Sequence, residues 1–232
     1  MQYVMSDIHG CYGRFLKILD TIGFSDTDSL YILGDSLDRG PDSIPLLRDL
    51  SLRTNVFHII GDHEFMAIRC LRAIGNAASE NIKDRLNNDE ITAMLNWLAD
   101  GGEPTMKGFG LLAPEEREGL LEYLEDMPLY DIAEAGGHKF VLTHAGISNF
   151  RQEKPLDEYE VGDLLFDAPD YGRRYFNDAY FITGHIPTRL TSPEGSDKIF
   201  RNRKGHIAID CGASYGGKLA CLCLDTLEDF YA

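Results

Sequence analysis

The chain has little of what marks a nucleic-acid-binding, disulfide-bonded or membrane-spanning protein. Its 22 lysines and arginines stand against 38 aspartates and glutamates, and the net charge of -16 argues against a general affinity for DNA, RNA or an anionic membrane, because a polyanion is bound by clustered positive charge. The five cysteines lack zinc-ribbon spacing, and their odd number excludes a complete disulfide framework. No apolar run approaches bilayer length and no basic, apolar leader precedes the first predicted strand, so we expect a cytoplasmic protein.

The length of 232 residues suits one large domain, and a hydrophobic content of 44% is enough to form a substantial core. The sequence contains no internal repeat and no low-complexity segment. We therefore expect residues 1–232 to form a single domain.

Five short polar motifs, each placed directly after an apolar run, are the most informative feature that is present. The apolar runs have the length and the β-branched or aromatic content of buried strands. In chain order the motifs are Asp7-Ile8-His9-Gly10, Gly34-Asp35-Ser36-Leu37-Asp38-Arg39-Gly40, Gly61-Asp62-His63-Glu64, Thr143-His144-Ala145-Gly146 and Thr183-Gly184-His185. If the strands lie side by side, these side chains converge at the strand ends, where α/β folds bind their ligands. Carboxylate oxygens mixed with imidazole suit manganese, iron or zinc better than calcium.

The spacing of apolar residues predicts the order of the secondary-structure elements. Residues 1–64 alternate strand, helix, strand, helix, strand, which implies parallel strands joined by right-handed crossovers. Residues from about 65 to 128 have helical spacing, and we expect a helical insertion that rims the site and holds Phe65, Trp97 and Phe109 in its core. The chain returns to strands from Leu129 and is expected to end as a meander.

The order of the five motifs and the residues in them resemble those of the PPP-type, calcineurin-like metallophosphoesterases. The resemblance is greatest to the small bacterial and phage serine/threonine protein phosphatases and to the related diadenosine tetraphosphate hydrolases. The resemblance covers nearly the whole chain, because residues 209–213 and 216–219 are similar to the closing strands of that family. It implies an α/β fold, a β-sandwich of two mixed sheets flanked by helices.

The resemblance also implies two divalent metal ions, which would be manganese, iron or zinc. It assigns the first metal to Asp7, His9 and Asp35, and the second to Asp35, Asp62, His144 and His185. A single histidine is more often a core or capping residue than a metal ligand. Three histidines that each follow a strand instead indicate metal binding. Two metals about 3.5 to 4 Å apart lower the pKa of a bridging water and supply hydroxide for in-line attack on phosphorus.

Three further residues are expected to act on the substrate. His63 is the expected proton donor to the leaving oxygen, with Asp38 hydrogen-bonded to its other ring nitrogen. Arg39 is expected to bind phosphate oxygens through its planar guanidinium group, and the resemblance places Asp62 and His63 beside the same phosphate. Glu64 is expected to favour the start of a helix rather than to take part in catalysis.

The sequence departs from the family pattern at two positions. Asp62 stands where relatives have asparagine, so the metal ligand is kept but the amide donor to phosphate is lost. Ala168 stands where an aligned arginine is expected, and Arg173, Arg174 and Arg189 are candidates to supply the missing charge. Both departures weaken the hold on phosphate, whether Asp62 is natural or introduced.

Three functions are compatible with these observations. The first expectation is hydrolysis of phosphate monoesters, as in a serine/threonine or tyrosine protein phosphatase whose partner is a phosphorylated protein, peptide or small molecule. The second is hydrolysis of a dinucleoside polyphosphate, which uses the same metals but needs a pocket for a base or ribose. The third is a catalytically weakened, phosphatase-like binding protein, motivated by Asp62 and Ala168. The sequence leaves the metal, the substrate and the oligomeric state open.

Overall fold

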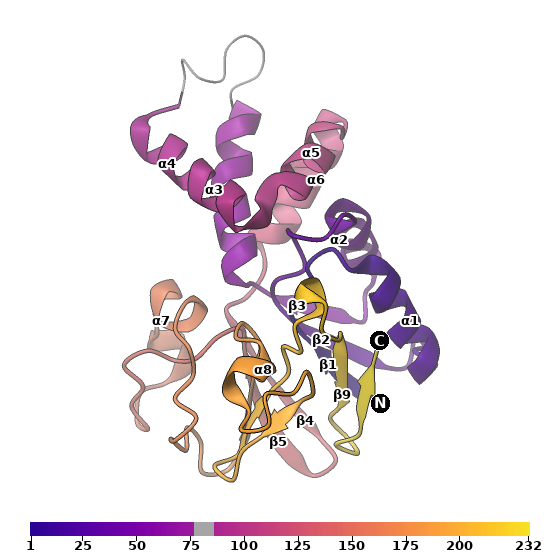
Figure 1. The fold of residues 1–232 in the computed structure, drawn as a ribbon, viewed down its shortest axis with the longest axis vertical. Helices are drawn as coiled ribbons and strands as arrows, with labels where there is room; N and C mark the ends of the chain where they lie inside the picture. The colour runs from indigo at the N-terminus through magenta and orange to yellow at the C-terminus, as the bar shows by residue number, and fades with distance from the viewer. Residues whose placement is uncertain (77–85) are drawn as a thin grey trace.

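The computed structural model describes residues 1–76 and 86–232, which include two five-stranded sheets (Figure 1). The first sheet has the order β10-β9-β1-β2-β3. Its strands are β1 (Gln2–Met5), β2 (Ser29–Leu33), β3 (Val56–Ile59), β9 (Ala220–Cys223) and β10 (Asp229–Tyr231). Strands β1, β2 and β3 are parallel and are joined by α1 (Tyr12–Ile22) and α2 (Ser43–Leu52). This confirms the predicted alternation of strand and helix.

The second sheet has the order β4-β5-β6-β8-β7. Its strands are β4 (Tyr130–Ala135), β5 (His138–Thr143), β6 (Tyr180–Thr183), β7 (Phe200–Arg201) and β8 (His206–Ala208). The predicted meander is wrong, because β6 and β8 are parallel and the next strand, β9, belongs to the first sheet. Alternation of apolar residues identifies a strand but does not determine the direction of its partner.

The two sheets pack face to face, which confirms the predicted sandwich. The core between them is formed by apolar side chains of both sheets, among them Val4, Leu33, Ile59, Phe140, Leu142, Ile182 and Leu222. Helices α1 and α2 cover the outer face of the first sheet through Phe15, Ile18 and Leu46. The outer face of the second sheet is covered by α7 (Val161–Leu165) and the loops around it, with Leu164 against Phe181. Short helices α8 (Thr188–Thr191), η3 (Leu156–Glu158) and η4 (Ala213–Tyr215) lie in the connections.

Helices fill most of the chain between β3 and β4, as predicted, and stand above the strand ends in Figure 1. They are α3 (Asp62–Asn76), α4 (Asn88–Trp97), the π-helix η2 (Leu98–Gly102), α5 (Glu103–Gly110) and α6 (Pro114–Glu125). Residues 77–85 of this segment lie outside the described residues. None of the helices within 1–76 and 86–232 is long and apolar enough to cross a membrane.

The aromatic residues of the helical segment are not all core residues. Trp97 and Phe109 are buried, as predicted, but the prediction for Phe65 is wrong, because its side chain is 41% exposed. Phe65 lies in the first turns of α3, and its ring packs edge-to-face on Phe166 with 5.9 Å between ring centroids. That the 232 residues form one domain stays a prediction.

Candidate metal centre

The backbone is unusual where the five motifs follow their strands. Eight non-glycine residues of the described part have positive φ, a region disfavoured for residues with a Cβ. Six of them are predicted site residues, namely Asp7, His9, Asp35, Asp38, Arg39 and His185. Such strain persists only where the surrounding structure enforces it, so the fold holds these side chains in place at an energetic cost.

The structure brings four predicted ligands together at the ends of β2, β3, β5 and β6. Asp35, Asp62, His144 and His185 offer atoms that all lie within 4.8 Å of one another. Nε2 of His144 lies 2.9 Å from Oδ1 of Asp62 and 3.6 Å from Oδ1 of Asp35. Nδ1 of His185 lies 3.3 Å from the same oxygen of Asp62. This group has the composition expected for the second metal.

A second group shares Asp35 with the first. His9, Asp35 and His63 offer atoms within 4.8 Å of one another, and Nε2 of His9 lies 3.4 Å from Oδ2 of Asp35. The two oxygens of Asp35 therefore face different groups, with Oδ1 toward His144 and Oδ2 toward His9. Asp35 therefore lies between the two groups, and its role as a bridging ligand stays a prediction.

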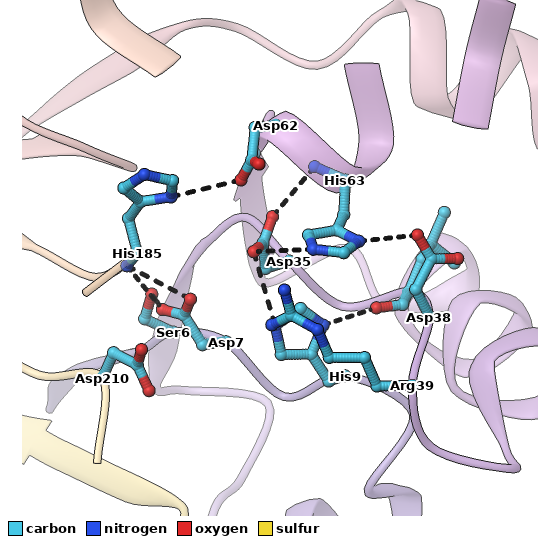
Figure 2. Close-up of polar contacts among 12 residues, drawn as sticks. Ser6, Asp7, His9, Asp35, Asp38, Arg39, Asp62, His63, His185 and Asp210 are labelled. Carbon is cyan, nitrogen blue, oxygen red and sulfur yellow. Dashed lines mark hydrogen bonds and ion pairs between the residues drawn. The ribbon is translucent and has the colours of Figure 1, made fainter. Parts of the chain in front are cut away.

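The structure does not bring Asp7 into either group. Its carboxylate accepts the backbone N–H of His185 at 3.1 and 3.0 Å and the hydroxyl of Ser6, as Figure 2 shows. A Cβ at position 184 would collide with Ser6 and Asp7, so glycine is required there. Asp7 thus ties β1 to β6, and its predicted role as a ligand of the first metal stays a prediction.

Each of the three predicted histidine ligands donates one ring N–H to a backbone carbonyl. Nδ1 of His9 donates to Leu37, Nδ1 of His144 to Leu33 and Nε2 of His185 to Phe166, at 2.7, 2.7 and 3.2 Å. The opposite nitrogen of each ring faces the carboxylates, where it can donate to them when protonated or bind a metal ion when unprotonated, as metal-binding histidines are usually oriented. The donor set and its tautomers fit two divalent transition-metal ions.

His63 is held by a buried carboxylate. Nδ1 of His63 lies 2.7 Å from Oδ2 of Asp38, and Nε2 is buried with no hydrogen-bond partner among the described residues. Burial alone would lower the pKa of His63, but the charge of Asp35 and the hydrogen bond to Asp38 raise it to about 9. The protonated imidazole can therefore present a proton from Nε2.

The helical segment anchors Asp38 through two residues that the sequence did not reveal. Trp97 donates Nε1–H to Oδ2 of Asp38 at 2.7 Å, and Thr105 donates its hydroxyl to Oδ1. Both partners are far from Asp38 along the chain, so only the tertiary structure identifies them. They fix the orientation of Asp38 and, through it, of His63.

Arg39 lies beside the second group, in contact with His9. Its Nη1 is 2.6 Å from Nε2 of His9, its Nη2 is 3.0 Å from Oδ1 of Asp100, and its guanidinium carbon is 4.9 Å from the centre of the Tyr215 ring. The other oxygen of Asp100 lies 3.6 Å from Nε2 of His63. Because Nε2 of His9 has one lone pair, a metal ion there requires Arg39 to turn away from His9.

Glu64 has a larger role than the predicted start of a helix. Its carboxylate is fully buried and accepts the backbone N–H groups of Asp35, Ser36, Leu37 and Gly61 at 2.7, 2.8, 3.3 and 3.0 Å. It therefore joins the loops that carry the second and third motifs. In the sequence, only its position beside His63 indicated that Glu64 belongs to the site.

Asp210 is a further residue at the site that the sequence did not reveal. It follows β8, is 4% exposed and accepts the N–H of Gly212 at 2.8 Å. Burial and the negative charge of Asp7 raise its pKa well above the usual value. Figure 2 shows its carboxylate next to Asp7. Asp210 follows a strand, as the motif residues do, and this position in the sequence could have indicated that it belongs to the site.

Two clusters of carboxylate and imidazole side chains, which share Asp35, thus lie at the strand ends of a two-sheet sandwich, an arrangement suited to two metal ions. The family model of the calcineurin-like phosphoesterases matches residues 3–212, and the chain belongs to this family. The match confirms the family that the sequence motifs resemble.

Known proteins similar to this chain include two kinds of nucleotide hydrolase. A symmetrical bis(5'-nucleosyl)-tetraphosphatase of Erwinia tasmaniensis is 31% identical over 136 residues, which cover 57% of this chain and 47% of that protein. The matched part of the chain thus spans about half the length of this relative. The asymmetrical bis(5'-nucleosyl)-tetraphosphatase PrpE of a Geobacillus species is 24% identical over 253 aligned positions, covering 97% of this chain and 91% of that protein.

Solved structures with the same fold include hydrolases of different names. A structure provisionally described as a diadenosine tetraphosphatase superposes with a TM-score of 0.68 at 17% identity, covering 100% of this chain and 92% of that chain. A protein serine/threonine phosphatase of Saccharomyces cerevisiae superposes with a TM-score of 0.57 at 14% identity, covering 95% and 71%. At these identities the likeness shows the fold alone.

Proposed function

We propose that this phosphoesterase hydrolyses dinucleoside polyphosphates such as diadenosine tetraphosphate. The observation that carries the proposal is a cavity of about 390 Å³ at the edge of the metal centre. It is lined by Arg39, His185, Pro187, Arg189, Leu190 and Tyr215. Its volume lies in the range of small-molecule sites.

The lining of this cavity suits a nucleoside attached to several phosphates. Tyr215 is 53% exposed, with Arg39 over its ring, and Leu190 is 74% exposed, so apolar surface beside Arg39 can contact a base. Arg39 and Arg189 place two guanidinium groups beside that surface, where they can bind successive phosphates. A phosphate monoester alone needs the metal groups and one arginine but no base-sized cavity.

Arg189 is the best placed of the three arginines that can replace the one missing at position 168. Its guanidinium group packs against Gly212 and donates to the carbonyl of Tyr215 at 3.1 Å. Arg173 instead lies over the ring of Phe150, and Arg174 lies beside Gly205 at the start of β8. Ala168 itself is exposed.

The names of the relatives support the same choice. Both the symmetrical and the asymmetrical relative are named as bis(5'-nucleosyl)-tetraphosphatases. The protein phosphatase that the sequence first suggested is represented by solved structures at low identity. The nucleotide substrate was the second expectation from the sequence, and it is now the better supported one.

The residues of this chain supply binding and proton transfer in the proposed reaction. Arg39 and Arg189 orient the polyphosphate, and His63 gives the proton on Nε2 to the leaving phosphate oxygen. Asp38 accepts from Nδ1 of His63 and stabilises the imidazolium form before transfer. Manganese, iron or zinc ions would neutralise phosphate charge and activate water, and their ligands would be the members of the two groups other than His63.

The test is a comparison of three substrates on purified protein loaded with manganese, iron or zinc. We expect kcat/KM for diadenosine tetraphosphate to exceed that for a phosphopeptide, and we expect Tyr215→Leu to lower the ratio of kcat/KM for diadenosine tetraphosphate to that for an aryl phosphate. Turnover of the phosphopeptide without turnover of the dinucleotide would establish a protein phosphatase instead. Metal-loaded protein that turns over none of the three would establish the weakened binding protein.

A further inference from the structure

A pair of exposed phenylalanines lies beside the metal centre but outside the Tyr215 cavity. Phe65 is 41% exposed and Phe166 is 44% exposed, although their rings contact each other edge-to-face. Phe65 belongs to α3, and Phe166 directly follows α7, so the pair links the two elements. Exposed aromatic side chains at the rim of a site offer an apolar face to a ligand.

Both phenylalanines lie close to the metal centre, Phe65 through its neighbours in the chain and Phe166 through a hydrogen bond. Phe65 comes directly after Asp62, His63 and Glu64 in the first turns of α3. The carbonyl of Phe166 accepts from Nε2 of His185 at 3.2 Å, while Nδ1 of the same ring faces Asp62. A molecule that contacts the two rings therefore lies next to the group that contains Asp62 and His185.

A small cavity continues from Phe65 along α3. Its volume is about 170 Å³, and it is lined by Phe65, Met66, Arg69, Cys70, Ala93 and Asn96. Arg69 is one helical turn beyond Phe65 and exposed, so its positive charge lies on the same face of the helix. The exposed Phe65 ring and the exposed Arg69 guanidinium group beside this cavity can contact a base and its attached phosphate.

We propose that Phe65 and Phe166 form a binding site for the second nucleoside of the substrate, with Arg69 beside it. This inference rests on the proposed function. The first nucleoside occupies the Tyr215 cavity, the second stacks on the phenylalanine pair, and the polyphosphate crosses the metal centre between them. The chemical class of the ligand is a nucleobase linked to a polyphosphate, and stacking on an aromatic side chain is worth about 1 to 3 kcal/mol per base.

The test compares diadenosine tetraphosphate with adenosine 5'-tetraphosphate, which lacks the second nucleoside. We expect the parent protein to favour the dinucleotide in kcat/KM, and Phe65→Leu combined with Phe166→Leu to reduce this preference by about tenfold, as the loss of base stacking implies. Phe65→Tyr keeps an aromatic face and should retain the preference. Phe57→Leu is the matched control, because Phe57 is 43% exposed and stacks on Tyr31, yet lies on β3 outside the site.

The outcomes separate this inference from the proposed function. If the double variant keeps the full preference while Tyr215→Leu loses it, the proposed function stands and the second nucleoside site is wrong. The same conclusion follows if Phe57→Leu lowers the preference as much as the double variant does. If the metal-loaded parent protein cleaves neither nucleotide, both proposals are wrong. Circular dichroism of each variant identifies a folding defect, and Phe65→Tyr then decides whether the aromatic face matters.

Discussion

Nδ1 of His63 lies 2.7 Å from Oδ2 of Asp38, which leaves Nε2 of the same ring buried and without a partner among the described residues. Unpaired buried polar atoms are uncommon, because each costs the free energy of its desolvation. Here the nitrogen lies 3.6 Å from Oδ2 of Asp100 and 4.0 Å from Oδ2 of Asp35, at the metal groups. The ring is therefore positioned to act on a group that binds between them.

We predict that His63→Asn lowers kcat without lowering metal content. Loss of a general acid costs about 10²- to 10⁴-fold, and less for substrates whose leaving group needs no proton. Steady-state kinetics on an aryl and an alkyl phosphate, with metal analysis of the same samples, measures both effects. The exposed His138 offers a control in His138→Asn. Equal losses on the aryl and alkyl substrates would show that His63 is not the acid.

We predict that Glu64→Gln destabilises the fold more than any exposed glutamate substitution. The buried carboxylate accepts four backbone N–H groups, and an amide would turn its own donors toward some of them. The loss should be about 3 kcal/mol, since hydrogen bonds to charged groups are individually worth roughly 1.5 to 3 kcal/mol. Urea unfolding measures it, with the exposed Glu122→Gln as control. A change no larger than that of the control would contradict the structural role of Glu64.

The sequence predicts the parts of this site that depend on local order along the chain. A strand followed by Asp or His is a local pattern, so the convergence of Asp35, Asp62, His144 and His185 could be predicted. The pairing of His63 with Asp38 could be predicted only through the resemblance to a family, because 25 residues separate them. The sandwich follows from the same strands.

Features that depend on packing between distant segments could not be predicted. Trp97 and Thr105 contact Asp38 although 59 and 67 residues of sequence separate them from it. The spacing of apolar residues along the chain does not predict such a contact. Phe65 has helical spacing like a core residue, but the helix turns that side chain outward. Strand β7 has two residues, which is too short for any alternation to appear.

We predict that Asp35→Asn removes metal from both groups, whereas His144→Asn removes it from one. The two carboxylate oxygens of Asp35 face His144 and His9 separately, so only Asp35 belongs to both groups. Metal analysis after mild purification should find about two equivalents per chain in the parent and fewer than one in Asp35→Asn. A single tightly held zinc ion in the parent protein would contradict the dinuclear centre.

We predict that His206 makes the fold less stable in mild acid. Burial lowers the pKa of His206 from 6.5 to about 4. Below pH 6.5 the unfolded chain binds the proton and the folded chain does not, so stability falls as the pH falls toward 4. The loss from this residue is about 2 kcal/mol between about pH 7 and about pH 5.

The variant His206→Phe isolates this contribution. His206 stacks on Tyr171 and Phe181, so a phenyl ring keeps the packing, although the hydrogen bond to Thr183 is lost. Neither neighbouring ring titrates in this pH range. Urea unfolding at both pH values should show a smaller loss of stability for the variant than for the parent. Parallel losses in the two proteins would show that His206 does not titrate with the shifted pKa.

The last prediction concerns Asp62, where this chain departs from the family pattern. Burial alone would raise its pKa, but hydrogen bonds with His144 and His185 lower it well below the usual value, so Asp62 is ionised. A carboxylate keeps a ligand oxygen for the metal, but it repels the phosphate and has no N–H to donate. Asp62→Asn restores a donor and removes a charge while it keeps one oxygen toward the two histidines.

We expect Asp62→Asn to raise kcat/KM. One hydrogen bond to a charged group is worth roughly 1.5 to 3 kcal/mol, which corresponds to about a ten- to hundred-fold gain if the bond strengthens in the transition state. Metal content and unfolding should hardly change, and the exposed Asp26→Asn serves as the control. Combining Asp62→Asn with Ala168→Arg should give a non-additive effect, because both side chains would address one phosphate. If Asp62→Asn is slower than the parent with its metals fully loaded, the carboxylate contributes to turnover and the account of a weakened hold on phosphate is wrong.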